Sequence, residues 1–210
     1  MSDIKIGKMT LGMCQTNCYF IFREGEENCI VVDPADRGAF LVEKLKENGH
    51  TVEAILLTHG HFDHLLGAEK MRELTGAKVY ALAEEEPLLL NAGENLSGAW
   101  AEPVTLKADE FLKDGQEVTI GGKTFKVLHT PGHTKGGCGF YFEEAGILIS
   151  GDSLFQESIG RTDFPGGSMS ELVRSVKEKF LTLPEDTRVF PGHGGSTTVG
   201  YEKINNCFLQ

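Results

Sequence analysis

The segment THGHFDH, residues 58–64, places three histidines and one aspartate within seven positions. It directly follows AILL, a continuous apolar run that suits a buried strand. His59 and His61 are two residues apart, so in an extended segment leaving that strand their side chains point the same way. If the chain then turns into a helix near His64, the side chains of Asp63 and His64 face a second point close by. The segment therefore predicts two pairs of metal ligands at the end of a buried strand, which is what a two-metal site needs.

Three further segments each bring one ligand-type side chain into a glycine-flanked loop after a predicted strand. His133 lies in TPGHTKGG, Asp152 in ISGDSLF and His193 in VFPGHGG. Taken singly, glycine and aspartate at such places are typical of ordinary turns. Together with residues 58–64, however, these segments give a common role to five of the chain's seven histidines. The two others, His50 and His129, are interpreted as ordinary surface or core histidines.

The rest of the chain alternates strand and helix patterns. Strands are predicted at 4–11, 18–22, 28–33, 54–58, 78–82, 117–120, 123–130, 138–142 and 146–152, and helices at 36–49, 65–76 and 168–183. Residues 84–104 predict a short helix and a loop over the working face. A Gly121-Gly122 turn and other hairpin-like connections indicate mixed sheets, so we expect a layered α/β protein with residues 1–210 in one domain.

The helix at 168–183 carries the clearest local signals. Ser168 and Glu171 fit a capping box at its start. One apolar face, which we interpret as core, is formed by Leu172, Val173, Val176, Phe180 and Leu181.

Composition excludes several classes of function. The formal net charge of −11 argues against a broad phosphate-binding surface, so we expect neither nucleic acid nor anionic membrane as a partner. The start, MSDIKIGKMTLG, shows no secretory signal, and every apolar run is too short to span a bilayer. The five cysteines are an odd number without a disulfide-scaffold spacing, so we expect reduced thiols in a cytoplasmic protein.

The motifs H-x-H-x-D-H, PGHT, GD and PGHG together resemble the metallo-β-lactamase superfamily over nearly the whole chain. The resemblance implies a four-layer αβ/βα sandwich with a metal site at one edge. It implies two divalent metal ions, for which zinc suits imidazole and carboxylate ligands best, with iron or manganese as alternatives. By motif position, one ion takes His59, His61 and His133, the other takes Asp63, His64 and His193, and Asp152 bridges them.

Within the superfamily, NCYF and IGRTDFPGG are similar to short glyoxalase II-like hydrolases, the hydroxyacylglutathione hydrolases. This implies cleavage of a thioester, such as S-2-hydroxyacylglutathione, by a metal-bound hydroxide, with Asp63 and Asp152 as catalytic residues. No general acid stands out beyond the ligands, which fits a thiolate leaving group better than an amide and disfavours β-lactam hydrolysis. Full-length glyoxalase II enzymes carry a C-terminal helical domain that holds glutathione, and we expect this chain to lack it.

Two residues are candidates for substrate binding. Arg161 suits a substrate carboxylate because a guanidinium binds carboxylates through two parallel hydrogen bonds. An ion pair with Asp163 explains Arg161 equally well. Lys135 is a weaker candidate for the same task. The small-molecule substrate is therefore expected to be a glutathione thioester.

Four other functions remain open. Persulfide dioxygenases share the GRTDF stretch and imply a single iron held by His59, His133 and Asp152. A lactonase would use the same two metals to open a cyclic ester. A non-catalytic metal-binding module predicts a closed site, which the glycine-flanked ligand loops disfavour. The nucleases of the superfamily are disfavoured by the acidic balance of the chain.

Overall fold

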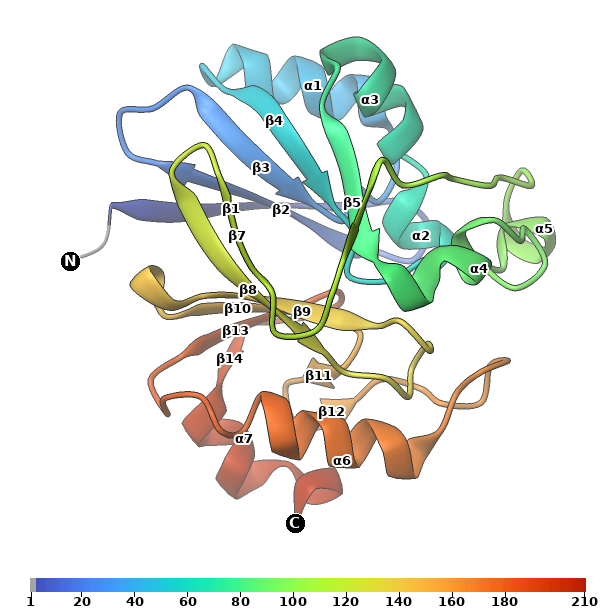
Figure 1. Ribbon diagram of the computed structural model, residues 1–210, viewed down its shortest axis with the longest axis vertical. Coiled ribbons are helices and arrows are strands. Elements are labelled where there is room, and N and C mark those ends of the chain that lie inside the picture. The colour runs from blue at the N-terminus through green and yellow to red at the C-terminus, as the bar shows by residue number, and fades with distance from the viewer. Residues whose placement is uncertain (1–2) are drawn as a thin grey trace.

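Two six-stranded β-sheets lie face to face, and helices cover the outer side of each, in the computed structural model of residues 3–210 (Figure 1). The first sheet has the strand order β1-β2-β3-β4-β5-β6. Its strands are β1 (Ile4–Leu11), β2 (Thr16–Arg23), β3 (Asn28–Val32), β4 (Thr51–Leu56), β5 (Lys78–Leu82) and β6 (Glu110–Leu112). β1 to β3 pair antiparallel and β3 to β6 pair parallel, so the sheet is mixed.

The second sheet has the order β14-β13-β10-β9-β8-β7. Its strands are β7 (Glu117–Ile120), β8 (Lys123–His129), β9 (Cys138–Phe142), β10 (Ile147–Gly151), β13 (Arg188–Pro191) and β14 (Thr197–Thr198). β8 and β10 both pair antiparallel with β9, and β13 pairs parallel with β10. The carboxyl ends of β8, β10 and β13 therefore meet at one edge of this sheet. A separate hairpin of β11 (Leu154–Phe155) and β12 (Ser158–Ile159) follows β10.

Helices form the two outer layers. α1 (Gly38–Glu47) and α3 (Ala68–Thr75) cover the first sheet, and α6 (Met169–Lys179) and α7 (Val199–Asn205) cover the second (Figure 1). Three shorter helices, α2 (Phe62–Leu65), α4 (Glu86–Leu89) and α5 (Ser97–Trp100), lie toward one end of the first sheet (Figure 1). Single 3₁₀ turns occupy η1 (Ala83–Glu85), η2 (Glu143–Ala145) and η3 (Cys207–Leu209).

Three apolar cores fill the spaces between the four layers. β3 explains how one strand serves two of them: Cys29 and Val31 point toward α1 and α3, whereas Ile30 and Val32 point toward the second sheet. Side chains alternate along a strand, so a strand buried on both faces reads as a continuous apolar run. The third core lies between the second sheet and α6, where Phe180 is fully buried. The expected four-layer sandwich with mixed sheets is confirmed.

Most of the predicted strands and helices are present in the structure, with specific differences. The single helix predicted at 65–76 is two helices, α2 and α3, which the turn at Gly67 separates. A Cβ at Gly67 would lie 2.2 Å from the carbonyl oxygen of Pro34, so only glycine fits at this position. The sequence patterns also missed β6, the β11–β12 hairpin, β14 and α7, most of which are very short.

The local signals of the sequence have several outcomes. The hydroxyl of Ser168 accepts a hydrogen bond from the Glu171 N–H at 3.4 Å and so caps α6. The backbone N–H of Ser168 donates to the Gly132 carbonyl at 2.8 Å, and not to the Glu171 side chain, so only half of the predicted capping box is present. The five cysteines are all free: Cys14 and Cys207 are exposed, and the other three are buried. Within residues 3–210, no helix combines the length and the apolar character needed to cross a bilayer.

Candidate metal centre

Seven side chains meet where the carboxyl ends of strands from both sheets face each other. They form three groups whose ligand atoms lie within 4.8 Å of one another: His59, His61 and His133; His59, His64 and Asp152; and Asp63, His64 and His193. β4 of the first sheet leads into residues 58–64, and β8, β10 and β13 of the second sheet lead into the other three ligand loops. Backbone hydrogen bonds cross between the sheets here, from Cys138 N to Thr58 O at 2.9 Å and from Asn17 N to Gly192 O at 2.7 Å.

Asp152 lies between the two sets of histidines. Its carboxylate is 3.6 Å from Nε2 of His133 and 3.5 Å from Nε2 of His64. Nε2 of His193 lies 3.4 Å from Asp152 and 3.3 Å from Asp63. On the other side, Nδ1 of His61 is 3.0 Å from Nε2 of His133. The geometry thus brings together every residue that the sequence singled out as a ligand, with Asp152 central among them.

Unpartnered polar atoms inside the cluster indicate what it is built to hold. Nε2 of His59, Nε2 of His64 and Oδ1 of Asp152 are buried and have no hydrogen-bond partner within residues 3–210. Buried polar atoms in native proteins are almost always partnered, so three orphans pointing into one cluster call for a missing group. Imidazole nitrogens and carboxylate oxygens are the donors that zinc and iron accept. The residues present therefore fit a pair of divalent cations.

The other ring nitrogens fix the orientation of these imidazoles. Nδ1 of His64 donates to the Asp33 carboxylate at 2.9 Å, and Nδ1 of His133 donates to the Arg161 carbonyl at 2.8 Å. Nδ1 of His59 lies 3.1 Å from the Thr58 hydroxyl, which itself donates to Asp33 at 2.6 Å. Each of these rings is thereby held with Nε2 directed into the cluster, as in metalloproteins whose second ligand sphere sets the tautomer.

The histidines differ in protonation when no cation is bound. Burial, reinforced by nearby His133, lowers the pKa of His61 to about 3. Burial alone would also lower the pKa of His64, but Asp63, Asp152 and Asp33 together raise it to about 9. Hydrogen bonds to Asp152 and Asp63 likewise outweigh burial at His193 and raise its pKa to about 10. Imidazolium groups thus neutralise the two carboxylates, which is the task that bound cations perform instead.

Glu85 connects two of the ligand loops and was missed by the sequence patterns. It is 1% exposed, and its carboxylate accepts from the Gly60 N–H and from the Gly136 N–H, both at 2.7 Å. Gly60 lies between His59 and His61, and Gly136 lies in the loop of His133. Within EEEPLLL nothing marks one glutamate as different, because its partners lie 25 and 51 residues away.

Gly192 leaves room for the cluster at its most crowded point. A Cβ there would lie 2.2 Å from Oδ1 of Asp152 and 2.6 Å from Cε1 of His64. Any side chain would displace one of these two groups. The glycine before His193 is therefore required by space, beyond its use in a turn.

A cavity of about 300 Å³ opens onto the cluster. Its lining combines candidate ligands with apolar and charged side chains, namely Cys14, His61, Phe62, Asp63, Leu96, Trp100, His133, Asp152, Arg161, Phe164 and His193. Arg161 is exposed, pairs with Asp163 through Nε at 2.7 Å and stacks on Phe164 at 3.8 Å. Lys135 is exposed and does not line this cavity.

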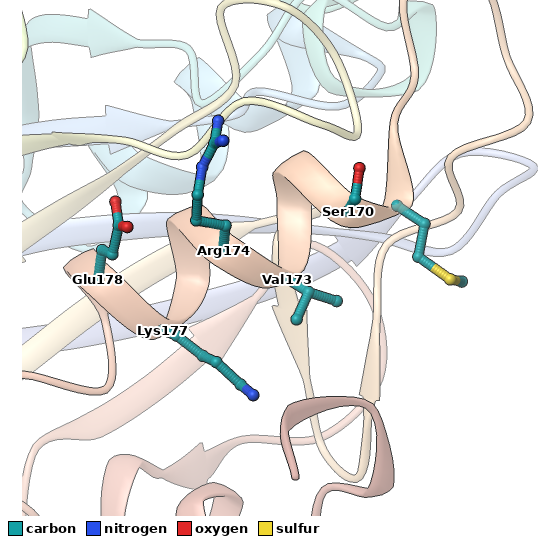
Figure 2. A pocket seen from close by; sticks show the side chains of 6 residues that line it. Ser170, Val173, Arg174, Lys177 and Glu178 are labelled. Atoms are coloured by element: carbon teal, nitrogen blue, oxygen red, sulfur yellow. The ribbon is translucent and has the colours of Figure 1, made fainter.

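A larger hollow of about 710 Å³ lies on the outer face of α6 and carries no comparable chemistry. Figure 2 shows Ser170, Val173, Arg174, Lys177 and Glu178 along its wall. Arg174 and Glu178 point to one side of the helix and Lys177 to the other (Figure 2). No candidate metal ligand lines this hollow, so the cavity at the sheet edge is the candidate functional site.

A family model and curated relatives match the part of the sequence that contains all seven candidate ligands. The family model for the metallo-beta-lactamase superfamily matches residues 11–193. The probable metallo-hydrolase YqgX of Bacillus subtilis is 40% identical over 209 residues, which are 99% of this chain and 98% of the relative. The hydroxyacylglutathione hydrolase GloC of Haemophilus influenzae is 35% identical over 202 residues, 93% of each protein.

Solved structures agree with the fold. The crystal structure of the BLEG-1 B3 metallo-beta-lactamase has a TM-score of 0.93 and 39% identity, covering 98% of this chain and all of that one. TTHA1623 in a di-iron-bound form has a TM-score of 0.84 and 36% identity, covering 97% of this chain and 100% of that one. With its sandwich of mixed sheets and its histidine–aspartate cluster at the shared edge, this chain belongs to the metallo-beta-lactamase superfamily.

Proposed function

We propose that this member of the superfamily is a metal-dependent hydrolase and that the bond it cleaves is a thioester. The observation that carries the hydrolase assignment is a cluster of candidate ligands that has buried, unpartnered atoms and that an open cavity reaches at Asp152. The similarity to a hydroxyacylglutathione hydrolase over 93% of the chain supports the thioester. In the reaction, water adds to the thioester carbonyl, the carbon–sulfur bond breaks, and a carboxylic acid and a thiol are released.

The cluster supplies two adjoining places for cations. His59, His61 and His133 would hold one, Asp63, His64 and His193 the other, and Asp152 lies where it reaches both. Divalent ions in such a pair supply Lewis acidity toward a carbonyl oxygen and lower the pKa of water to roughly 7. We propose zinc from the donor chemistry, with iron as the alternative that the di-iron form of a 36% identical protein supports.

The cavity favours a leaving group that departs without a proton donor. Among the described residues that line it, the one acidic group outside the candidate ligands is the thiol of Cys14. Partial burial and the nearby carboxylate of Asp63 raise the pKa of that thiol, so it is a poor general acid. A thiolate, whose conjugate acid has a pKa of about 8.5, leaves readily without such help. An amine leaving group does not.

Recognition of the thiol carrier is assigned to Arg161. It lies at the mouth of the cavity, beside Phe164 and with His133 bonded to its backbone carbonyl. Its guanidinium is already paired with Asp163, so a substrate carboxylate would have to displace that partner. We therefore propose glutathione as carrier on the basis of similarity to GloC, with Arg161 as the contact to test first.

The deciding experiment uses protein purified without added metal. Elemental analysis is expected to find two divalent ions per chain, and the same sample is expected to hydrolyse S-lactoylglutathione. Asp152→Ala should abolish turnover and lower the metal content, whereas His50→Ala should retain both, because His50 packs on Phe22 away from the cluster. Unchanged turnover in Asp152→Ala would overturn the two-metal assignment.

A second candidate is β-lactam hydrolysis, which the 39% identity to a B3 metallo-beta-lactamase favours. Assays of a penicillin and a cephalosporin beside the thioester rank the two activities by kcat/KM. Two further reactions share the same ligands: ring opening of a lactone, and oxygen-dependent oxidation of a persulfide at one iron on His59, His133 and Asp152. A lactone in the panel tests the former, and oxygen uptake with glutathione persulfide tests the latter.

We also propose a cytoplasmic location. The five cysteines are free, and two of them, Cys14 and Cys207, are exposed. Exposed thiols persist in reducing compartments and are oxidised outside them.

A further inference from the structure

An apolar wall forms part of the cavity that the candidate metal ligands also line. Phe62, Leu96 and Trp100 line the same 300 Å³ space as His61, Asp63 and Asp152. Trp100 is 60% exposed and is the only tryptophan of the chain. Single exposed apolar residues are common on protein surfaces, but several gathered at one cavity mark a binding surface.

The segment that carries Leu96 and Trp100 is hydrogen-bonded to the segment that carries four of the candidate ligands. The backbone N–H of Phe62, between His61 and Asp63, donates to the carbonyl of Asn95 at 2.9 Å. The Asn95 side chain is fully buried, accepts from Ser97 N at 2.9 Å and donates to the Val104 carbonyl at 2.8 Å. This network fixes the start of α5 relative to the ligands, so the apolar wall is a preformed part of the site.

Leu96 holds a backbone conformation that leucine rarely adopts. Its φ is 70°, in the left-handed region that favours glycine or asparagine. Such residues persist where the surrounding structure fixes them, and they concentrate at binding and catalytic sites. Here the flanking bonds of Asn95 and Ser97 fix it, and the result is a large aliphatic side chain on the cavity lining.

Phe164 adds a further aromatic ring to the cavity lining. The ring of Phe164 lies 5.7 Å from that of His61. The guanidinium of Arg161 lies over the Phe164 ring, 3.8 Å from its centroid. The cavity is at the small end of the roughly 300–1,000 Å³ range of ligand pockets. A compact group therefore fits inside, whereas a carrier as large as glutathione must extend outward past the rim.

We infer that the acyl group of the substrate is apolar and bulky, aromatic or branched aliphatic, and that it lies against Leu96 and Trp100 during hydrolysis. This inference rests on the proposed thioester hydrolysis. It makes Trp100 and Leu96 specificity-determining residues. The preferred substrates are 2-hydroxyacyl thioesters with a ring or branched chain in place of the methyl group of lactate.

The first test compares S-mandeloylglutathione with S-lactoylglutathione, which differ only by a phenyl ring in place of a methyl group. The wild type is expected to favour the mandeloyl thioester by about tenfold in kcat/KM, the scale of a well-filled apolar pocket. Trp100→Ala should remove this preference by raising KM for the mandeloyl thioester much more than KM for the lactoyl thioester. Trp100→Phe should restore it.

The matched control is Leu90→Ala. Leu90 is 48% exposed, directly follows α4 in the same connecting segment and does not line the cavity. This variant should keep the wild-type preference. Equal kcat/KM for the two thioesters in the wild type, or an equal loss for both in Trp100→Ala, would overturn the inference.

A second test needs no turnover. Because Trp100 is the sole tryptophan, intrinsic tryptophan fluorescence reports on this wall alone. Mandelate, one product, should change the fluorescence saturably, whereas lactate at the same concentrations should bind about tenfold more weakly. If neither thioester is hydrolysed, the proposed function fails. The mandelate titration then still tests whether the apolar wall binds a bulky apolar group. An unchanged tryptophan fluorescence would overturn the inference.

Discussion

The carboxylate of Asp33 lies 2.9 Å from Nδ1 of His64, although the two residues are 31 positions apart in the sequence. The same carboxylate accepts from both the N–H and the hydroxyl of Thr58, at 2.8 and 2.6 Å. Asp33 follows β3 and Thr58 follows β4, so one fully buried carboxylate joins two strand ends and one candidate ligand. It therefore directs Nε2 of His64 toward the other candidate ligands.

Replacing Asp33 by asparagine should weaken metal binding more than it weakens the fold. An amide keeps the size but loses the charge that favours His64 as a ligand, and changes of this kind cost about 10–100-fold in metal affinity. Competition with a chromogenic chelator measures the affinity. The control is Asp36→Asn on the same loop, where the carboxylate accepts a hydrogen bond from the adjacent Arg37 N–H at 2.6 Å. An Asp33→Asn protein that holds metal as tightly as the control would contradict this role.

Glu85→Gln should lower activity without removing a ligand. Glutamine offers one acceptor oxygen, so either Gly60 or Gly136 loses its partner and faces an NH₂ group instead. An unsatisfied buried N–H costs about 1–3 kcal/mol, and the two ligand loops are then free to separate. We expect a kcat lower by about tenfold and a lower thermal midpoint, measured by steady-state assay and calorimetry.

The matched variant for this position is Glu84→Gln. Glu84 is the exposed neighbour of Glu85, and the same chemical change there should leave both quantities at wild-type values. If the two variants behave alike, Glu85 does not hold the loops together.

Removing metal should lower the thermal midpoint substantially. A ligand present at a hundred times its Kd stabilises the native state by about 2.7 kcal/mol. For a chain of this size each kcal/mol corresponds to about 2–4 °C, so chelation should lower Tm by about 5–10 °C. Scanning calorimetry before and after dialysis against a chelator measures the shift. Asp152→Ala should show a smaller shift, and an equal shift in both proteins would argue against Asp152 as a ligand.

The ion pair between Asp114 and Lys179 should stabilise the protein only above acidic pH. Lys179 Nζ lies 2.6 Å from the Asp114 carboxylate, which also accepts from the His129 N–H at 3.0 Å. Burial alone would raise the pKa of Asp114, but these partners outweigh it and hold the pKa below its ordinary value of 3.8. The stabilisation is therefore present above pH 4 or so and disappears as the pH falls through the lowered pKa.

Asp114→Asn should accordingly lower Tm at pH 7 and match the wild type more closely as the pH is reduced below about 4. Glu178→Gln, beside Lys179 on the exposed side of α6, should show no such pH-dependent difference. A constant gap between Asp114→Asn and the wild type at every pH would point to lost packing instead of lost charge.

Sequence patterns identified the candidate ligands because those residues obey local rules. His59 and His61 lie in the loop that follows β4, and Asp152 follows directly after β10. Strand ends that share a sheet edge bring such residues together whatever the rest of the chain does. The period-two alternation and the helix cap at Ser168 are local in the same sense, which explains why the layers and α6 were predictable.

The supporting residues could not be found in the same way. Asp33 and Glu85 act by accepting hydrogen bonds from backbone groups that lie 25 or more residues away, and a backbone N–H leaves no mark on a sequence. Trp100 and Leu96 sit in a segment with weak periodicity, whose conformation depends on the buried bonds of Asn95. What the sequence lacked was the tertiary context of these four positions.

The candidate ligands are divided between two stretches of the chain that fold into different sheets. His59, His61, Asp63 and His64 all precede β6, whereas His133, Asp152 and His193 all follow β7. An ion held by His61 and His133 would cross-link residues 72 positions apart, as a disulfide does, but reversibly. During synthesis, the first four ligands emerge from the ribosome well before their partners. If the candidate ligands bind metal as proposed, its supply to the growing chain would affect how the two halves join as well as the proposed catalysis.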